Sequence, residues 1–123
     1  MNPRKSKIAT IRITDLHLRT IIGIYDWERT EKQDVIINVT MDYDAAKAVA
    51  TDKIKHAIDY KAITKEIIKN VEGSRFQLLE KLADVVMKIV LADPRVLRAV
   101  VRVDKPGALR FAKSVSVEFS ADR

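Results

Sequence analysis

The chain has 123 residues, 47% of them apolar and only three Gly and three Pro, which suits one compact domain without a long disordered segment. It contains no cysteine, which excludes disulfides, thiolate zinc sites and cysteine nucleophiles. The 23 basic and 17 acidic residues give a net charge of +6, but the basic residues are scattered among only three Phe, three Tyr and one Trp, so we expect no nucleic-acid partner.

The N-terminal segment 1–7 is polar and is predicted to be a flexible tail before a single domain over residues 8–123. No apolar run approaches the ~20 residues of a membrane span, and the tail lacks the apolar stretch of a signal peptide. We therefore expect a cytoplasmic protein with no membrane partner.

Alternating apolar residues predict two strands in the first third of the chain. Ile11 and Ile13, continued by Leu16 and Leu18, indicate the first strand. The stretch 23–32 is rich in Gly and charged residues, which is typical of a loop, and a second strand follows over 35–43. Together they predict an antiparallel hairpin.

The middle of the chain has helical periodicity. Residues 44–49 are Ala-rich and predict one or two helical turns. Apolar residues then recur every three or four positions from Tyr60, behind a possible Asp59 cap, until Gly73 ends the pattern. A second helix is predicted from Ser74 until Pro94 breaks it.

The last third returns to strands, predicted over 97–103 and 115–119 around a Lys-Pro-Gly loop. This order predicts an α+β fold with a four-stranded antiparallel sheet and two helices on one face. Ile36 and Val100 lie out of phase with the residues that would face the helices. We therefore expect apolar groups on the second face as well, which favours a homo-oligomer.

Four polar residues are candidates for chemistry: Glu28, Tyr60, Glu80 and Lys105. Each also has an ordinary structural interpretation. Glu28 could be a solvated loop charge and Tyr60 an aromatic residue at the edge of the core. Glu80 could be on the polar flank of a helix, and Lys105 could be a turn residue. Glu80 directly follows two leucines, so its carboxylate could be buried. A buried carboxylate needs parallel N–H donors, which Arg75 or an aminopyrimidinone ring would supply.

Other site types find no support in the sequence. His17 and His56 are too few for a zinc set unless other chains contribute. There is no Gly-rich phosphate loop, no nucleophile elbow and no carboxylate cluster with metal-ligand spacing. We expect neither a metal nor a cofactor, and the residue patterns alone indicate only a small oligomeric α+β domain.

Four segments nonetheless carry a resemblance that covers most of the chain: GIYDWERTEKQ (23–33), AIDY (57–60), VEGSRFQLLEKL (71–82) and DKPGALRFAKSVSV (104–117). In order and spacing they are similar to the dihydroneopterin aldolase and dihydroneopterin triphosphate epimerase family. The resemblance implies the tunnelling fold, in which ββααββ subunits join their sheets into a tetrameric barrel and two rings commonly stack into an octamer. It also implies active sites between subunits, and a pterin substrate.

The resemblance also implies roles for particular residues. Glu80 would anchor the pterin through two hydrogen bonds, and the backbone around four residues would hold other ring edges: Ile58, Gln77, Leu78 and Leu79. Lys105 and Tyr60 would transfer protons in a retro-aldol cleavage of the side chain, with Glu28 orienting hydroxyls or water. The substrate's own C=N bond would accept the electrons. Recombination with a rotated aldehyde would invert C2′.

The choice of activity within the family depends on which segments are weighted. The strands resemble the epimerase branch, whereas Tyr25 to Glu28 and Lys105 to Ala108 resemble aldolases. Because loops contact substrates, we predict a dihydroneopterin aldolase of folate biosynthesis with accompanying 2′-epimerase activity. The alternatives are a dihydroneopterin triphosphate 2′-epimerase and a non-catalytic oligomer that binds pterins or purines.

Overall fold

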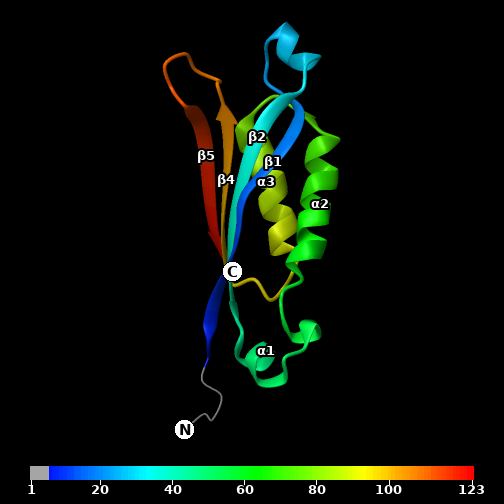
Figure 1. Ribbon diagram of the computed structural model, residues 1–123, viewed down its shortest axis with the longest axis vertical. Helices are drawn as coiled ribbons and strands as arrows, with labels where there is room; N and C mark the ends of the chain where they lie inside the picture. Colours follow the sequence, from blue (N-terminus) through cyan, green and yellow to red (C-terminus); the bar gives the residue numbers. More distant parts are fainter. Residues whose placement is uncertain (1–5) are drawn as a thin grey trace.

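The computed structural model describes residues 6–123 (Figure 1). Its elements, in chain order, are β1 (Ile8–Ile22), η1 (Asp26–Arg29), β2 (Gln33–Asp44), α1 (Ala46–Thr51), η2 (Ile54–His56), α2 (Tyr60–Glu72), β3 (Arg75–Phe76), α3 (Leu79–Leu91), β4 (Arg98–Pro106) and β5 (Ser114–Asp122). Residues 1–5 of the predicted flexible tail lie outside the described residues. Lys7, in the same predicted tail, donates its backbone amide to the Asp44 carboxylate, and its carbonyl accepts a hydrogen bond from the Ala45 amide.

The sheet has five strands in the order β3-β1-β2-β4-β5, and this corrects the predicted four-stranded antiparallel sheet. The extra strand, β3, pairs in parallel with Ile21 and Ile22 at the end of β1. The second long helix consequently begins at Leu79 and not at Ser74. Arg75 and Phe76 are extended because the Phe76 carbonyl accepts hydrogen bonds from the Gly23 amide and the Arg29 side chain. In a helical turn this carbonyl would not point toward those donors.

The helices α2 and α3 cover one face of the sheet, as predicted (Figure 1). The Asp59 carboxylate caps α2 by accepting a hydrogen bond from the Ala62 amide at 3.0 Å. Each helix buries one apolar stripe, formed by Ile63, Ile67 and Val71 in α2 and by Leu82, Ala83, Val86, Met87 and Val90 in α3. Within residues 6–123, no helix combines the length and apolar character that a membrane crossing requires.

The core lies between these helices and the alternate residues of the central strands, as the two-residue period predicts. In β2 every second side chain from Val35 to Tyr43 is buried, and in β4 the same holds from Ala99 to Val103. The register places Val39 between Ile13 and Val101. The same phase points Lys105, two residues after Val103, toward the helix-covered side.

The open face of the sheet is more polar than predicted. Ile36 and Val100 are half-buried there, but Ile36 lies between His17 and Asp104 in the register, and Val100 is paired with Thr40. Arg102–Asp104 and Arg98–Asp122 ion pairs cross the same face. The free strand edges are therefore the clearer sites for association. Within residues 6–123 no strand pairs with the edge of β1 that faces away from β2 before Ile21, or with the outer edge of β5.

Candidate active site

The centre of the site is an ion pair between Glu28 and Lys105, two residues that lie 77 positions apart in the chain. The short helix η1 presents Glu28 inward from the β1–β2 hairpin, and the end of β4 presents Lys105. The Lys105 Nζ atom lies 2.5 Å from the Glu28 Oε2 atom, and the two side chains are only 12% and 7% exposed. The fold therefore brings two of the predicted catalytic residues together within one chain.

Four donors surround the Glu28 carboxylate. Its Oε1 atom accepts hydrogen bonds from the amides of Ile24 and Tyr25, each at 3.2 Å. Its Oε2 atom accepts a third from the Gln33 side chain at 3.2 Å, in addition to that from Lys105. The backbone just before η1 and the first residue of β2 thus form a closed cradle for this side chain.

The pKa of the Glu28 carboxyl is lowered from its ordinary 4.5 to about 2. Burial is the largest single influence and acts to raise the pKa, but the hydrogen bonds from Lys105, Tyr25 and Gln33 and the charge of Lys105 together outweigh it. Glu28 is therefore a carboxylate at neutral pH. It can accept hydrogen bonds and hold a cation, but it has no proton to donate.

Sequence reasoning missed the two residues that complete this cradle. Gln33 bridges Glu28 and the Ile22 carbonyl, to which it donates at 2.7 Å. Gly23 has a φ of +130° and its missing Cβ leaves the space that the Glu28 carboxylate fills. Gly23 and Gln33 are the first and last residues of the segment 23–33 that carried the family resemblance, but only the tertiary structure shows what they contact.

Glu80 lies in the first turn of α3, and that helix begins at the same end of the sheet as Lys105 (Figure 1). Its carboxylate is exposed and not buried, and within residues 6–123 it forms no hydrogen bond or ion pair. Arg75, the partner that the sequence offered for it, instead donates to the Arg29 carbonyl at 2.7 Å. The first backbone hydrogen bond of α3 joins the Leu82 amide to the Leu78 carbonyl, so the amides that precede Leu82 in the first turn have no partner within the helix.

The remaining predicted residues, the substrate-binding ones and the catalytic Tyr60, divide between two ends of the molecule. Gln77 and Leu78 are exposed and Leu79 is half-buried, all three beside the start of α3. Tyr60 begins α2 at the opposite end, about 16 Å along the helix from Val71. Tyr60 is 50% exposed and the neighbouring Ile58 is buried. Tyr60 and Ile58 therefore do not join the Glu28–Lys105 pair within one chain.

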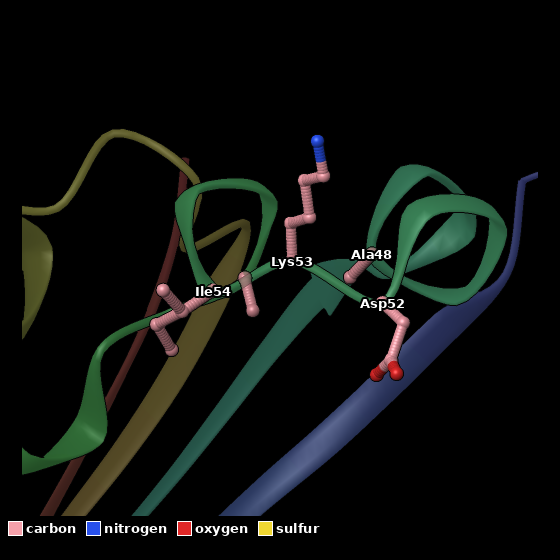
Figure 2. A pocket seen from close by; sticks show the side chains of 5 residues that line it. Ala48, Asp52, Lys53 and Ile54 are labelled. Carbon is pink, nitrogen blue, oxygen red and sulfur yellow. The ribbon is translucent and has the colours of Figure 1, made fainter.

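A surface pocket of about 350 Å³ lies at the α1 end, away from the ion pair, and is lined by Ala48, Asp52, Lys53, Ile54 and Ala57. Figure 2 shows the Lys53 and Asp52 side chains pointing to opposite sides of the chain. Polar groups that diverge cannot orient a small molecule between them. We therefore place the candidate site at the Glu28–Lys105 pair and not at this pocket.

The family model of dihydroneopterin aldolase (FolB) matches residues 11–120. The chain belongs to the dihydroneopterin aldolase family. This confirms the family that the sequence motifs indicated.

Relatives with both family activities resemble the chain over most of its length. The dihydroneopterin triphosphate 2′-epimerase of Pseudomonas aeruginosa is 50% identical over 116 residues, which are 94% of each chain. The dihydroneopterin aldolase of Escherichia coli K12 is 34% identical over 105 residues, which are 85% of this chain and 86% of that one. The similarity to these enzymes thus supports an enzymatic role for the chain, and its identity to the epimerase is higher than its identity to the aldolase.

The fold agrees with a solved structure of the family. The crystal structure of Escherichia coli dihydroneopterin aldolase in complex with neopterin superposes with a TM-score of 0.87 at 32% identity. The match covers 92% of this chain and 98% of that chain. The α+β architecture implied by the resemblance is thereby confirmed.

Proposed function

We propose that this protein rearranges the trihydroxypropyl side chain of a 7,8-dihydroneopterin through a retro-aldol step, with 2′-epimerisation of dihydroneopterin triphosphate as its main activity. The observation that carries the chemistry is the buried Glu28–Lys105 pair, which lies at the end of the sheet where α3 begins. The 50% identity to an epimerase, against 34% to an aldolase, favours inversion over net cleavage. This reverses the preference derived from the loops.

Glu80 is proposed as the pterin anchor. Its exposed carboxylate at the start of α3 can accept two parallel hydrogen bonds from an aminopyrimidinone ring, which would specify the orientation of the ring. The backbone of Gln77, Leu78 and Leu79 would contact the remaining ring edge. A related crystal structure is a complex with neopterin, which supports a pterin as the ligand of this chain.

The second half of the site is proposed to come from a neighbouring subunit. Tyr60 and Ile58 lie at the far end of α2, too distant to reach Lys105 of their own chain. The free edges of β1 and β5 offer a way to join sheets between subunits into a barrel. Such a closed ring would bring the Tyr60 end of one chain to the Lys105 end of the next.

The proposed reaction begins with removal of the 2′-hydroxyl proton and protonation at N5. The C1′–C2′ bond then breaks, its electron pair forms a C6=C1′ bond while the π pair of N5=C6 moves to the protonated N5, and an aldehyde and an enamine result. Rotation of the aldehyde and re-formation of the bond invert C2′, whereas protonation of the enamine at C1′ completes cleavage. Lys105 and Tyr60 would move these protons, and Glu28 would hold the Lys105 ammonium in place.

Dihydroneopterin aldolase activity is the second candidate, because the runs Tyr25 to Glu28 and Lys105 to Ala108 resemble aldolase loops. In that case the enamine is protonated before the aldehyde recombines. The products are 6-hydroxymethyl-7,8-dihydropterin and glycolaldehyde. Both candidates use the same carbon–carbon cleavage and differ in what happens to the enamine afterwards.

Parallel assays of the purified protein separate the candidates. It is incubated with 7,8-dihydroneopterin triphosphate and, separately, with 7,8-dihydroneopterin, and products are resolved by chromatography. We expect a higher kcat/KM for inversion of the triphosphate than for release of glycolaldehyde. The reverse ratio would establish the aldolase as the main activity, and pterin binding without turnover of either compound would leave only the non-catalytic alternative.

A further inference from the structure

We infer that Arg29 is a positioning residue, which sets the distance between the Glu28–Lys105 pair and the pterin-anchoring start of α3. The inference rests on the proposed function, since it concerns how the Glu28–Lys105 pair and the start of α3 are held at a fixed distance from each other. Arg29 directly follows Glu28 in η1, and its side chain crosses to the segment that leads into α3. No pattern in the sequence singled it out.

The Arg29 guanidinium bonds three backbone carbonyls. Its Nη1 atom donates to the Gly23 carbonyl at 3.0 Å and to the Phe76 carbonyl at 3.2 Å. Its Nη2 atom donates to the Arg75 carbonyl at 2.6 Å. One side chain thus ties the backbone of the catalytic loop to both residues of β3.

Two further contacts run between the same segments. The Arg75 side chain donates back to the Arg29 carbonyl at 2.7 Å, and the Gly23 amide donates to the Phe76 carbonyl at 3.2 Å. We call these bonds, together with the three from the Arg29 guanidinium, the Arg29 clamp. Because Phe76 lies only four residues before Glu80, the clamp links the loop that holds Glu28 to the helix start that carries Glu80.

The chemistry of the clamp requires arginine. A lysine ammonium also has three N–H donors, but they all lie on one nitrogen, whereas the planar guanidinium spreads its donors over separate nitrogens, and the three carbonyls are bonded from both Nη1 and Nη2. Within residues 6–123, Arg29 forms no ion pair with a carboxylate, so its charge serves backbone carbonyls alone. A two-residue strand such as β3 is not stable by pairing alone, which is why a side chain is needed to hold it.

Loss of the clamp should misplace the two halves of the site without removing either. The donors to the Glu28 carboxylate besides Lys105 are the Ile24 and Tyr25 amides and the Gln33 side chain. Within residues 6–123 none of them hydrogen-bonds the Arg29 side chain, which reaches the cradle only at the Gly23 carbonyl. A displacement of about 1 Å between reacting groups can cost about 100-fold in rate. We therefore expect Arg29→Ala to lower kcat by about 10- to 100-fold while neopterin affinity changes by less than about 3-fold.

Arg123 offers a matched control, because its side chain also bonds three backbone carbonyls, those of Val96, Leu91 and Asp93. It ties the C-terminus to the end of α3 that lies away from Glu80. Arg123→Ala should therefore lose a similar amount of thermal stability and keep its kcat. Circular dichroism melting, steady-state kinetics and neopterin fluorescence titration on both variants measure the three quantities.

The outcomes are distinct. A kcat loss in Arg29→Ala beyond that of Arg123→Ala, with neopterin affinity kept, supports the inference, and equal kcat values for the two variants overturn it. If Arg29→Ala does not fold, Arg29→Lys takes its place, since it keeps the charge without the fork; a wild-type kcat in that variant overturns the inference. A wild-type protein that turns over neither pterin substrate overturns the proposed function instead, and the inference falls with it.

Discussion

Gly23 and Glu28 are fitted to one another so closely that a Cβ atom on residue 23 would lie 2.2 Å from the Glu28 Cδ atom. The absence of a side chain at one position is thus what allows the carboxylate to be buried at the other. The positive φ of Gly23 adds a second requirement for glycine, because it turns the chain from β1 into the loop. The Glu28–Lys105 pair depends on both.

Gly23→Ala should therefore displace the Glu28 carboxylate from its cradle. We expect a loss of more than about 3 kcal/mol in the free energy of unfolding, because a buried ion pair is disturbed as well as the backbone. Gly107→Ala is the control, since Gly107 also has a positive φ but a Cβ atom added there would meet no atom within 4 Å. That variant should lose only about 1 kcal/mol. Urea unfolding of both measures the difference, and equal losses would contradict the steric account.

Lys105 and Glu28 should be energetically coupled. Removing one partner leaves a buried charge and typically costs about 3–5 kcal/mol, whereas removing both costs less than the sum. We expect Lys105→Met and Glu28→Gln each to destabilise the fold, and the double variant to be more stable than additivity predicts. A double-mutant cycle from urea unfolding gives the coupling energy. Strict additivity would show that the 2.5 Å contact contributes nothing to stability.

Acid should remove the contribution of Glu28 to stability. The pKa of this carboxyl is about 2 in the folded chain against an ordinary 4.5, so between these values the unfolded chain binds a proton that the folded chain does not. The free energy of unfolding therefore falls as the pH falls. We expect the stability difference between wild type and Glu28→Gln to be complete above about pH 5 and to shrink steadily toward pH 3. A difference that stays constant over that range would contradict the lowered pKa.

Tyr60 and Lys105 should complement each other between subunits if the proposed site is shared. Tyr60→Phe and Lys105→Ala should each lose turnover while binding neopterin. Unfolded together in equal amounts and refolded, they should recover about a quarter of wild-type activity, because random assembly then pairs an intact Tyr60 with an intact Lys105 at about one site in four. Mixing the proteins without unfolding is the control. No recovery after joint refolding would place both residues in the site of a single chain.

Glu80 should act on binding more than on turnover. Glu80→Ala removes the proposed bidentate acceptor and should weaken neopterin binding by about 10-fold or more, which corresponds to about 1.4 kcal/mol. Glu72→Ala, at an exposed acidic position near the end of α2, is a suitable control. Fluorescence titration of the two variants gives both dissociation constants. Unchanged affinity in Glu80→Ala would exclude it as the pterin anchor.

Most of the secondary structure could be predicted because hydrophobic periodicity records which side chains face the core. The alternation from Val35 to Tyr43 and the stripe from Ile63 to Val71 both appear as buried faces. The missed strand β3 and the wrong start of α3 fall where the sequence has no hydrophobic periodicity. Arg75 and Phe76 form a strand only because Gly23 and Arg29, far away in the sequence, hydrogen-bond their carbonyls.

Motif spacing and hydrophobic periodicity were enough to predict the family, the helix-covered face of the sheet and four candidate polar residues, because both are local properties of the chain. The contact between Glu28 and Lys105 within one chain, and the position of Tyr60 at the first residue of α2, away from that contact, became known from the three-dimensional structure. The structure also showed that Gly23, Gln33 and Arg29 contact Glu28 or the loop that carries it. These relationships depend on how distant segments pack, and contacts of that kind leave no periodic trace in the order of residues.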